Sequence, residues 1–252
     1  MTRPVTDLSI IVLSYRAPWS LVEAVSSVCT QQPPAEIIVV NSGGGGAARL
    51  LKESGVEVKV IEHPGRLLPG GARNLGISHS NGRYIAFLAD DCRAAPGWVA
   101  ARLEAHARGL AAVASAVVCD RPGNPVALAS HLSLFVRRMP ATPEQEALYY
   151  GASYDRRLFE THGLFSEDMR GGEDTEFHLR LEPHERPIWT PAVRMIHRSP
   201  STLRGFLADQ YRRGGRTVRA WKSIDGRTSW SVVSAAIRRE TNMGVSVRSD
   251  GA

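Results

Sequence analysis

A regular alternation of buried strands and helices along the first 120 residues is the feature that most constrains the fold. Short runs rich in valine and isoleucine, such as 8–15 and 35–41, are typical of strands buried on both faces of a sheet. Helical patterns separate these runs, and a helix is the usual connection between parallel strands. The sequence therefore predicts an α/β domain with a mainly parallel sheet and helices on both faces.

The boundaries of these elements follow from apolar periodicity and from the positions of proline and glycine. The predicted strands are 8–15, 35–41, 56–62, 83–89 and 110–120. The predicted helices begin at Pro18 and span 47–54, 72–80 and 96–109, with a loop over 63–71. In the second half we expect a helix over 126–139, short strands at 187–190 and 193–197, and a basic helix from about Ser201.

The net charge of +6 favours an anionic partner, such as nucleotide phosphates, nucleic acid or an acidic membrane surface. Nucleic-acid binding is disfavoured, because the arginine-rich stretch has little aromatic interleaving and no helix-turn-helix or RNA-recognition signature is present. No apolar run reaches the roughly 18 residues that a membrane-spanning helix needs. Three cysteines without a C-x-x-C pair predict reduced thiols, a cytoplasmic location and no cysteine-based zinc site.

Polar residues follow three of the predicted strands at the point where each strand ends. Ser14 and Tyr15 end the first strand, Asn41 and four glycines follow the second, and Asp90 with Asp91 follow the fourth. In a parallel sheet these ends lie at one edge, and ligands bind in the crevice outside it. The sequence therefore predicts a ligand site at this edge.

The glycines do not form a known phosphate-binding motif. SYRAPW stands where G-x-G-x-x-G would follow the first strand, and no G-x-x-x-x-G-K-[ST] is present, which excludes a P-loop NTPase at the level of the motif. Residues 43–46 either let a ligand approach the backbone or form a flexible turn.

Two acidic segments carry candidate chemistry. Asp90 and Asp91 are hard oxygen ligands suited to Mg²⁺ or Mn²⁺, and a hydrophilic surface loop explains them equally well. In GGEDTEFHLRL, residues 171–181, Glu173 and Asp174 open a helix. Acids there complement the helix dipole, or one of them acts as a general base facing the crevice.

Five segments taken together resemble family 2 glycosyltransferases of the GT-A fold. SIIVLSY, EIIVVNSGG, GARNLGI, YIAFLADDC with PGW, and GLF with GGEDTEFHLRL occur in that family in this order and at similar spacing. The resemblance covers residues 7–215. It implies a Rossmann-like GT-A fold and an inverting transfer of a sugar from a nucleoside-diphosphate sugar, with UDP expected, to an acceptor hydroxyl. It also implies a divalent metal, Mn²⁺ or Mg²⁺.

The resemblance assigns roles to single residues. The end of the first strand, Ser14 and Tyr15, and the position of Asn41 hold the nucleotide base, although the family usually has aspartate where this chain has Asn41. Arg73 matches a family arginine that lies near the nucleotide. In the family motif D-x-D the second acid binds the metal, and it aligns with Asp91.

The first acid of D-x-D, which commonly contacts the ribose or nucleotide, aligns with Ala89. Asp90 fills the middle position, and it either substitutes in part as a nucleotide-binding residue or points away. Asp174 aligns with the catalytic base of the family. His197 resembles a histidine that completes the metal shell in some relatives, and a structural role is the alternative. QYRRG, residues 210–214, lacks the tryptophan of the Q-x-x-R-W motif of processive relatives.

The resemblance also implies a domain organisation. We expect a catalytic domain over 1–200, with a nucleotide-binding half at 1–120 and an acceptor half at 121–200, followed by a basic helical extension over 201–252. The acceptor is a glycan, a lipid-linked sugar or a small molecule. In the extension, an apolar stripe containing Leu203, Leu207 and Tyr211 beside arginines fits either peripheral contact with an anionic membrane or packing on the catalytic domain.

Two other functions remain open from the residues. Ala89 and Asn41 replace family acids, so the chain could be a nucleotide-sugar-binding module with weakened or lost catalysis. A nucleotidyltransferase would share the Rossmann-like half, but it would carry a glycine-rich basic loop after the first strand, and SYRAPW is not such a loop.

Overall fold

A computed structural model describes residues 7–149 and 151–225, with the side chains of the last helix described as far as Gly214. The chain divides into two units, Met1–Leu203 and Arg204–Ala252. All the strands of the described residues belong to the first unit and form one sheet.

The sheet has eight strands in the order β3-β2-β1-β4-β7-β6-β8-β5. Strands β3, β2, β1 and β4 pair in parallel, as do β6 and β8. Only β7 and β5 run antiparallel to their neighbours, so the predicted mainly parallel sheet is confirmed. The strands are β1 (Leu8–Tyr15), β2 (Glu36–Ser42), β3 (Lys59–His63), β4 (Tyr84–Ala89), β5 (Cys92–Ala94), β6 (Ala112–Cys119), β7 (Ser153–Asp155) and β8 (Ile188–His197).

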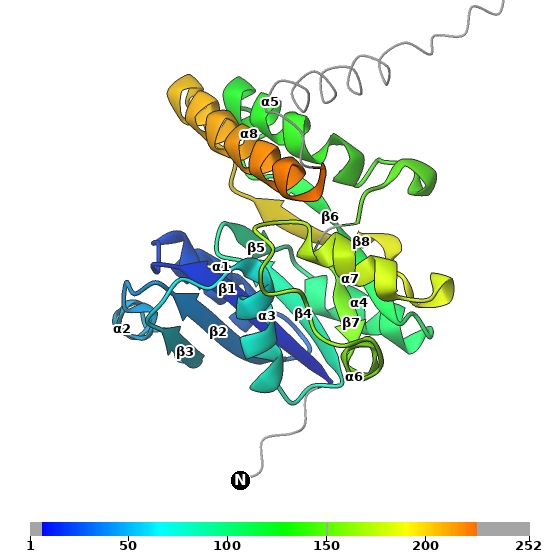
Figure 1. Ribbon diagram of the computed structural model, residues 1–252. Helices are drawn as coiled ribbons and strands as arrows, with labels where there is room; N and C mark the ends of the chain where they lie inside the picture. The colour runs from blue at the N-terminus through cyan, green and yellow to red at the C-terminus, as the bar shows by residue number, and fades with distance from the viewer. Residues whose placement is uncertain (1–6, 150, 226–252) are drawn as a thin grey trace, which may run out of the picture. The chain divides into compact units, whose positions relative to one another are not determined.

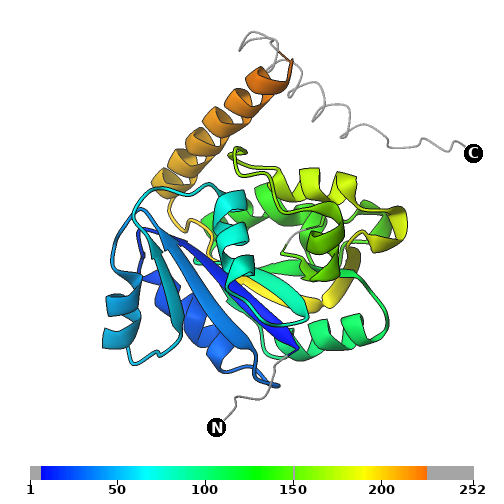
Figure 2. The same ribbon diagram turned by 60° about the horizontal axis from the view of Figure 1, so that its bottom comes forward.

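Helices cover both faces of the sheet, as the alternating pattern predicts (Figures 1 and 2). Helices α1, α2, α4 and α5 contribute to the core on one face, and α3, α6 and α7 to the core on the other. The helices are α1 (Ser20–Cys29), α2 (Ala47–Glu53), α3 (Pro69–Ser78), α4 (Trp98–Ala107), α5 (Pro125–Phe135), α6 (Arg157–His162), α7 (Glu173–Arg180) and α8 (Leu203–Asp225). Short 3₁₀ turns occur at Val136–Arg138, Glu144–Glu146 and Pro183–Glu185.

Strand β4 shows why the central strands are apolar throughout. Tyr84, Ala86 and Leu88 point into the core on the α1 side, whereas Ile85 and Phe87 point into the core on the α3 side. All five are buried, because successive side chains of a strand alternate between its two faces and both faces are covered. Burying a side chain of this size contributes about 1.5–3 kcal/mol, so the two layers together fix the register of β4.

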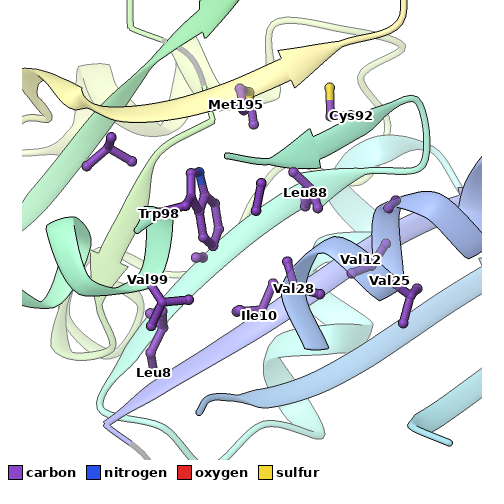
Figure 3. Close-up of a cluster of buried hydrophobic side chains, with 14 of the residues drawn as sticks. Leu8, Ile10, Val12, Val25, Val28, Leu88, Cys92, Trp98, Val99 and Met195 are labelled. Atoms are coloured by element: carbon purple, nitrogen blue, oxygen red, sulfur yellow. The ribbon is translucent and has the colours of Figure 1, made fainter. Parts of the chain in front are cut away.

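A buried cation sits inside the core on the α1 side. The indole of Trp98 packs near Leu88 and Met195 (Figure 3), and the guanidinium of Arg102 lies 4.1 Å from the indole centroid. Arg102 is fully buried and donates from Nη1 to the carbonyl of Val113 and to Ser153 Oγ. These contacts join α4 to β6 and β7.

The start of α3 differs from the prediction. The segment 63–71 was expected to be a loop, but α3 begins at Pro69. Proline suits the first helical position, and a Cβ on Gly70 would lie 2.0 Å from the carbonyl oxygen of Ser166. The glycines therefore let the helix approach the 165–167 segment closely, and this tertiary contact offsets their low helix propensity.

The two strands predicted near residue 190 form one strand, β8. Ser115 pairs with Thr190 and the next residue, Ala116, pairs with Arg194, so three residues beginning with Pro191 bulge from the ladder. Proline has no N–H to donate to the ladder, which explains the irregularity at this point. Strands β5 and β7 and helix α6 were not predicted, because three to six residues are too few for a periodic pattern.

The hydrogen bonds of His106 in this core require the neutral form of its ring. His106 Nδ1 lies 2.8 Å from the carbonyl oxygen of Leu110, and Nε2 lies 2.8 Å from Ser153 Oγ. Since Ser153 Oγ accepts from Arg102, its own hydrogen is directed to His106 Nε2. The ring also stacks on Tyr84 at 4.1 Å. Burial lowers the pKa of His106 to about 4.

We therefore expect the free energy of unfolding to fall as the pH decreases from 6.5 towards 4. In that range the unfolded chain binds a proton that native His106 does not, which removes up to about 3 kcal/mol. Urea unfolding at neutral pH and near pH 4.5 measures the loss. His106→Phe keeps a ring against Tyr84 without the titrating group, so its pH dependence should be smaller; an equal dependence would contradict the assignment.

Candidate functional site

The carboxyl ends of β2, β1 and β4 lie side by side at one edge of the sheet. Ser14 of β1 is paired with Asn41 of β2, and Leu13 is paired with Ala89 at the end of β4. The polar residues that the sequence placed after three separate strands are therefore neighbours.

Asp90 turns from the end of β4 towards β1. Its Oδ2 accepts a hydrogen bond from Ser14 Oγ at 2.8 Å and from the Tyr15 backbone N–H at 3.3 Å. Burial raises the pKa of the Asp90 carboxyl, against the opposing effect of the Ser14 hydrogen bond. Asp90 thus ties β4 to β1.

Asp91 turns the other way, towards β8. Its Oδ2 lies 3.6 Å from Nε2 of His197, and its side chain is half exposed, whereas His197 is buried. The pairing of β5 with β8 produces this arrangement, because it sets Cys92 opposite His197. The Arg198 N–H also donates to the Asp91 carbonyl at 2.9 Å, which holds the turn between β4 and β5 against β8.

The Asp91–His197 pair fits a divalent cation in part. His197 Nδ1 lies 3.3 Å from Ser199 Oγ, which leaves Nε2 directed at Asp91. Within the described residues no group of three or more His, Cys, Asp or Glu side chains could hold a metal. A carboxylate and an imidazole alone do not complete a metal shell, but Mg²⁺ and similar ions commonly use one or two protein ligands together with substrate phosphates and water.

Asn41 is fully buried, and its amide bonds to the protein itself. Its Oδ1 accepts from the Ala17 N–H at 3.0 Å, and its Nδ2 donates to the Gly44 carbonyl at 2.8 Å and to Glu62 Oε2 at 2.7 Å. Asn41 therefore organises the loops after β1 and β2. Glu62 is an exposed acid at the end of β3, and its carboxylate also accepts from the Ala48 N–H.

Sequence analysis did not single out Glu62. Its position at the end of a predicted strand could have indicated it. The parallel pairing of β2 and β3 places Glu62 opposite Asn41. The pairing of strands far apart in sequence is not visible in a single strand pattern.

Tyr15 presents a partly exposed aromatic ring close to two cations. The guanidinium carbons of Arg16 and Arg66 lie 5.2 and 5.3 Å from the ring centroid, and Tyr15 is 42% exposed. The ring packs on the glycine loop, where a Cβ on Gly43 would lie 2.5 Å from Tyr15 Cε2. Since Gly43 also has φ +76°, only glycine fits there without strain. Arg66, in a predicted loop, was not identified from the sequence.

Arg73 is bound to the acidic helix α7. Its Nη1 lies 2.6 Å from Glu173 Oε1, and both side chains are largely buried. The guanidinium carbon also lies 5.3 Å from the ring centroid of Phe87 and 5.0 Å from that of Phe165. The predicted contact between Arg73 and a nucleotide is not tested by this arrangement and stays a prediction.

Asp174 is the second residue of α7, which begins directly after Gly172, a glycine with a φ of 86°. Glu173 and Phe177 are buried, whereas Asp174 is partly exposed. One turn further on, His178 Nε2 lies 2.7 Å from the Tyr154 hydroxyl. Burial lowers the pKa of His178 to about 4, against the opposing charge of Asp174, so the ring that bonds to the Tyr154 hydroxyl is neutral at pH 7.

Helix α8 carries an exposed apolar stripe. Leu203, Leu207 and Tyr211 recur every four residues and are 61%, 59% and 85% exposed. No helix within residues 7–149 and 151–225 has the length and hydropathy required to cross a membrane. The rest of the predicted C-terminal extension, residues 226–252, lies outside the described part of the chain.

Comparison with known proteins identifies the family. Residues 9–172 match the family described as Glycosyl transferase family 2. The chain belongs to this family. The predicted family resemblance is thereby confirmed.

Curated relatives of this family 2 chain include the pre-mycofactocin glycosyltransferases of two Mycobacterium tuberculosis strains, CDC 1551 / Oshkosh and H37Rv. Each is 30% identical to it over 169 residues, or 63% of this chain and 36% of the relative. The chain therefore spans about a third of the length of the curated relatives it matches.

Solved structures with the same fold include one from Pyrobaculum calidifontis and one from S. aureus. A Pyrobaculum calidifontis mannosyltransferase, PcManGT, in complex with GDP-Man and Mn²⁺, has a TM-score of 0.61 and 19% identity, covering 88% of this chain and 65% of that one. S. aureus TarS in complex with UDP-GlcNAc has a TM-score of 0.59 and 16% identity, covering 80% and 61%. These likenesses confirm the GT-A fold.

Proposed function

We propose that this family 2 chain is an inverting glycosyltransferase that moves a sugar from a nucleoside-diphosphate sugar to an acceptor hydroxyl. The observation that carries the proposal is the Asp91–His197 pair at the ligand-binding edge of the sheet. It is the arrangement expected where a metal-bound diphosphate lies, and solved structures of the same fold hold GDP-Man with Mn²⁺ in one case and UDP-GlcNAc in another.

The donor lies along the carboxyl ends of the strands in this proposal. The diphosphate lies near Asp91, at the end of β4, and the base lies towards β2 and β3, near Tyr15 and Glu62. From β4 to β3 is three strand spacings, about 14 Å, which leaves room for the base and the diphosphate at opposite ends. The Arg16 and Arg66 guanidinium groups add positive charge beside the Tyr15 ring.

The nucleotide and the metal are the finer parts of the proposal. We propose UDP as the carrier from the family resemblance; because the similar structures hold UDP-GlcNAc in one case and GDP-Man in the other, both nucleotides enter the tests below. Asp91 and His197 are the residues that would hold Mn²⁺ or Mg²⁺. When bound, the ion offsets the negative charge that builds on the leaving diphosphate.

Asp174 is proposed as the general base. Its carboxylate takes the proton from the acceptor hydroxyl while that oxygen attacks the anomeric carbon on the face opposite the leaving diphosphate. Its place at the start of a helix packed on the core suits this role, because a catalytic group has to be held in one direction. The acceptor is a glycan, a lipid-linked sugar or a small molecule with a free hydroxyl.

Metal-dependent nucleotide binding tests the donor site. We expect UDP or GDP to raise the melting temperature of the protein more with Mn²⁺ than without it. Asp91→Asn removes a proposed ligand and should weaken Mn²⁺-dependent binding by at least the roughly 10- to 100-fold that loss of an outer-shell partner costs. Isothermal titration with each nucleotide measures the change. Glu104→Gln, an exposed acid on α4, is the control; equal binding by both variants would refute the assignment.

Turnover tests the base. Asp174→Asn should lower kcat by about 10²- to 10⁴-fold, because it removes proton transfer in the transition state. Nucleotide affinity should change by less than about twofold, since a base contributes to the reaction and not to donor binding. Glu176→Gln, on the same helix, is the control. Unchanged turnover in the Asp174 variant would remove this residue from the mechanism.

The alternative is a nucleotide-sugar-binding module with weakened or lost catalysis. Ala89 in place of an acid favours it, as does the engagement of the whole Asn41 amide within the protein. Tight, Mn²⁺-dependent binding of a nucleotide sugar without hydrolysis or transfer of any donor would support this second function.

We also propose that α8 contacts an anionic bilayer. Its exposed stripe of Leu203, Leu207 and Tyr211 lies beside basic residues such as Arg204, a combination suited to acidic lipid headgroups. We expect co-sedimentation with vesicles containing phosphatidylglycerol, but not with pure phosphatidylcholine, and a loss of binding at high salt.

Leu207→Asp should reduce this binding, and Arg204→Gln should weaken it about fivefold, the effect of about 1 kcal/mol per cation. Arg49→Gln, on the other unit of the chain, is the control. Absence of binding to anionic vesicles at low salt would show that the stripe has another role.

A further inference from the structure

Glu173, the residue before the proposed base, forms a buried ion pair. Arg73 of α3 and Glu173 of α7 are 100 residues apart in sequence and form an ion pair at 2.6 Å. Their side chains are only 16% and 6% exposed. The Phe87 and Phe165 rings flank the guanidinium, so little water competes for the pair.

Apolar packing alone leaves the direction of Asp174 underdetermined. Helix α7 has eight residues, and its buried apolar anchor is Phe177, whose ring lies 4.9 Å from that of Phe165 and 5.0 Å from that of Phe159. A single aromatic anchor resists removal of the helix from the core better than it resists rotation about the helix axis. A rotation of α7 would swing Asp174 away from the acceptor.

Several polar contacts of α7 oppose such a rotation. Arg180, at the end of the helix, donates to the Leu164 carbonyl at 2.7 Å, and two other contacts lie on either side of Asp174. The first is the Arg73–Glu173 pair, at the first residue of the helix. The second is the hydrogen bond of His178 with the Tyr154 hydroxyl, one turn after Asp174. Asp174 lies between these two points, so the helical turn that carries it is held in place. Its Oδ1 accepts a hydrogen bond from the Thr175 N–H at 2.8 Å.

We propose that Arg73 and Glu173 are positioning residues, which hold the first turn of α7 so that Asp174 is directed at the acceptor. The inference rests on the proposed function of Asp174 as base and adds a role for its buried neighbours. A buried ion pair contributes little net stability compared with an apolar pair of similar size. The pair instead fixes the orientation of α7, because a charge-assisted hydrogen bond to a planar guanidinium tolerates little change in geometry.

The double variant R73M/E173M separates positioning from stability. Methionine has a similar volume to both side chains, and replacing both charges leaves no unpaired charge in the core. We expect this variant to fold, with a melting temperature close to or above that of the wild type. In this proposal Arg73 holds α7 in place of the predicted nucleotide contact. We therefore expect kcat to fall by about 10²-fold, the cost of a misplacement of about 1 Å, with nucleotide affinity within about twofold of the wild type.

The E173Q variant is the conservative replacement. Its amide oxygen still accepts from Arg73, so kcat should fall less than in the double variant. E176Q, on the same helix but paired with the half-exposed Arg180, should keep wild-type kcat. A wild-type kcat in R73M/E173M would overturn the proposal. A large loss of nucleotide affinity in R73M alone would also overturn it, because Arg73 would then bind the donor directly.

Hydrogen exchange tests the same proposal without any substrate. The Glu176 N–H donates to the Gly172 carbonyl at 2.9 Å in the first turn of α7, and the Ala101 N–H donates to the Gly97 carbonyl at 2.9 Å in the first turn of α4. Both helices begin after a glycine with positive φ, so the two amides form a matched pair. In R73M/E173M we expect exchange at Glu176 to be about tenfold faster or more, and exchange at Ala101 to be unchanged.

The two experiments fail in different ways. If the wild type transfers no sugar from any donor, the proposed function fails, and the exchange measurement still decides whether the pair holds α7. If Glu176 exchanges at the wild-type rate in the double variant, the positioning role fails whatever the enzyme does. Faster exchange with unchanged kcat would show that the pair holds the helix without affecting catalysis, and that result would also overturn the proposal.

Discussion

The parallel pairing of β2, β1 and β4 is the constraint on which the rest of the structure depends. It brings three strand ends to one edge, so that Ser14, Asn41 and Asp90 become neighbours although up to 76 residues separate them. The pairing is stable because both faces of these strands are buried, and a shift by one residue would turn every core side chain to the wrong face. The polar ends can therefore vary without loss of the sheet, which leaves them available for binding.

Strand β5 has a different effect on the same edge. Only Asp90 and Asp91 separate it from β4, yet it pairs with β8, at the far end of the strand order. The two adjacent acids are thereby divided: Asp90 bonds to β1, and Asp91 faces His197. Adjacent carboxylates repel each other, and turning them to different partners lowers that cost. The same division separates the acid that bonds to β1 from the acid that we propose as a metal ligand.

The sequence predicted the longer elements well, because eight-residue strands and ten-residue helices carry a readable periodicity. It missed β5, β7 and α6, which are too short for a pattern, and it placed the start of α3 too late. In the site, Asp90, Asp91 and Asp174 could be named from the sequence as candidate functional acids. The contacts of Asn41, Glu62 and Arg66 could not be predicted from it. The partners of these residues come from other strands and loops, and their contacts depend on how the strands pair.

By itself, the sequence determined the mainly parallel α/β sheet, the edge at which polar residues gather and the family to which the chain belongs. These follow from local patterns and from the order of short motifs, which need no knowledge of contacts. Only the tertiary structure decided that Asn41 is buried, that Asp90 and Asp91 have different partners, and that Arg73 binds Glu173 beside Asp174. Those outcomes depend on the direction of single side chains across a packed interface, and such directions are set by neighbours that lie far away along the chain.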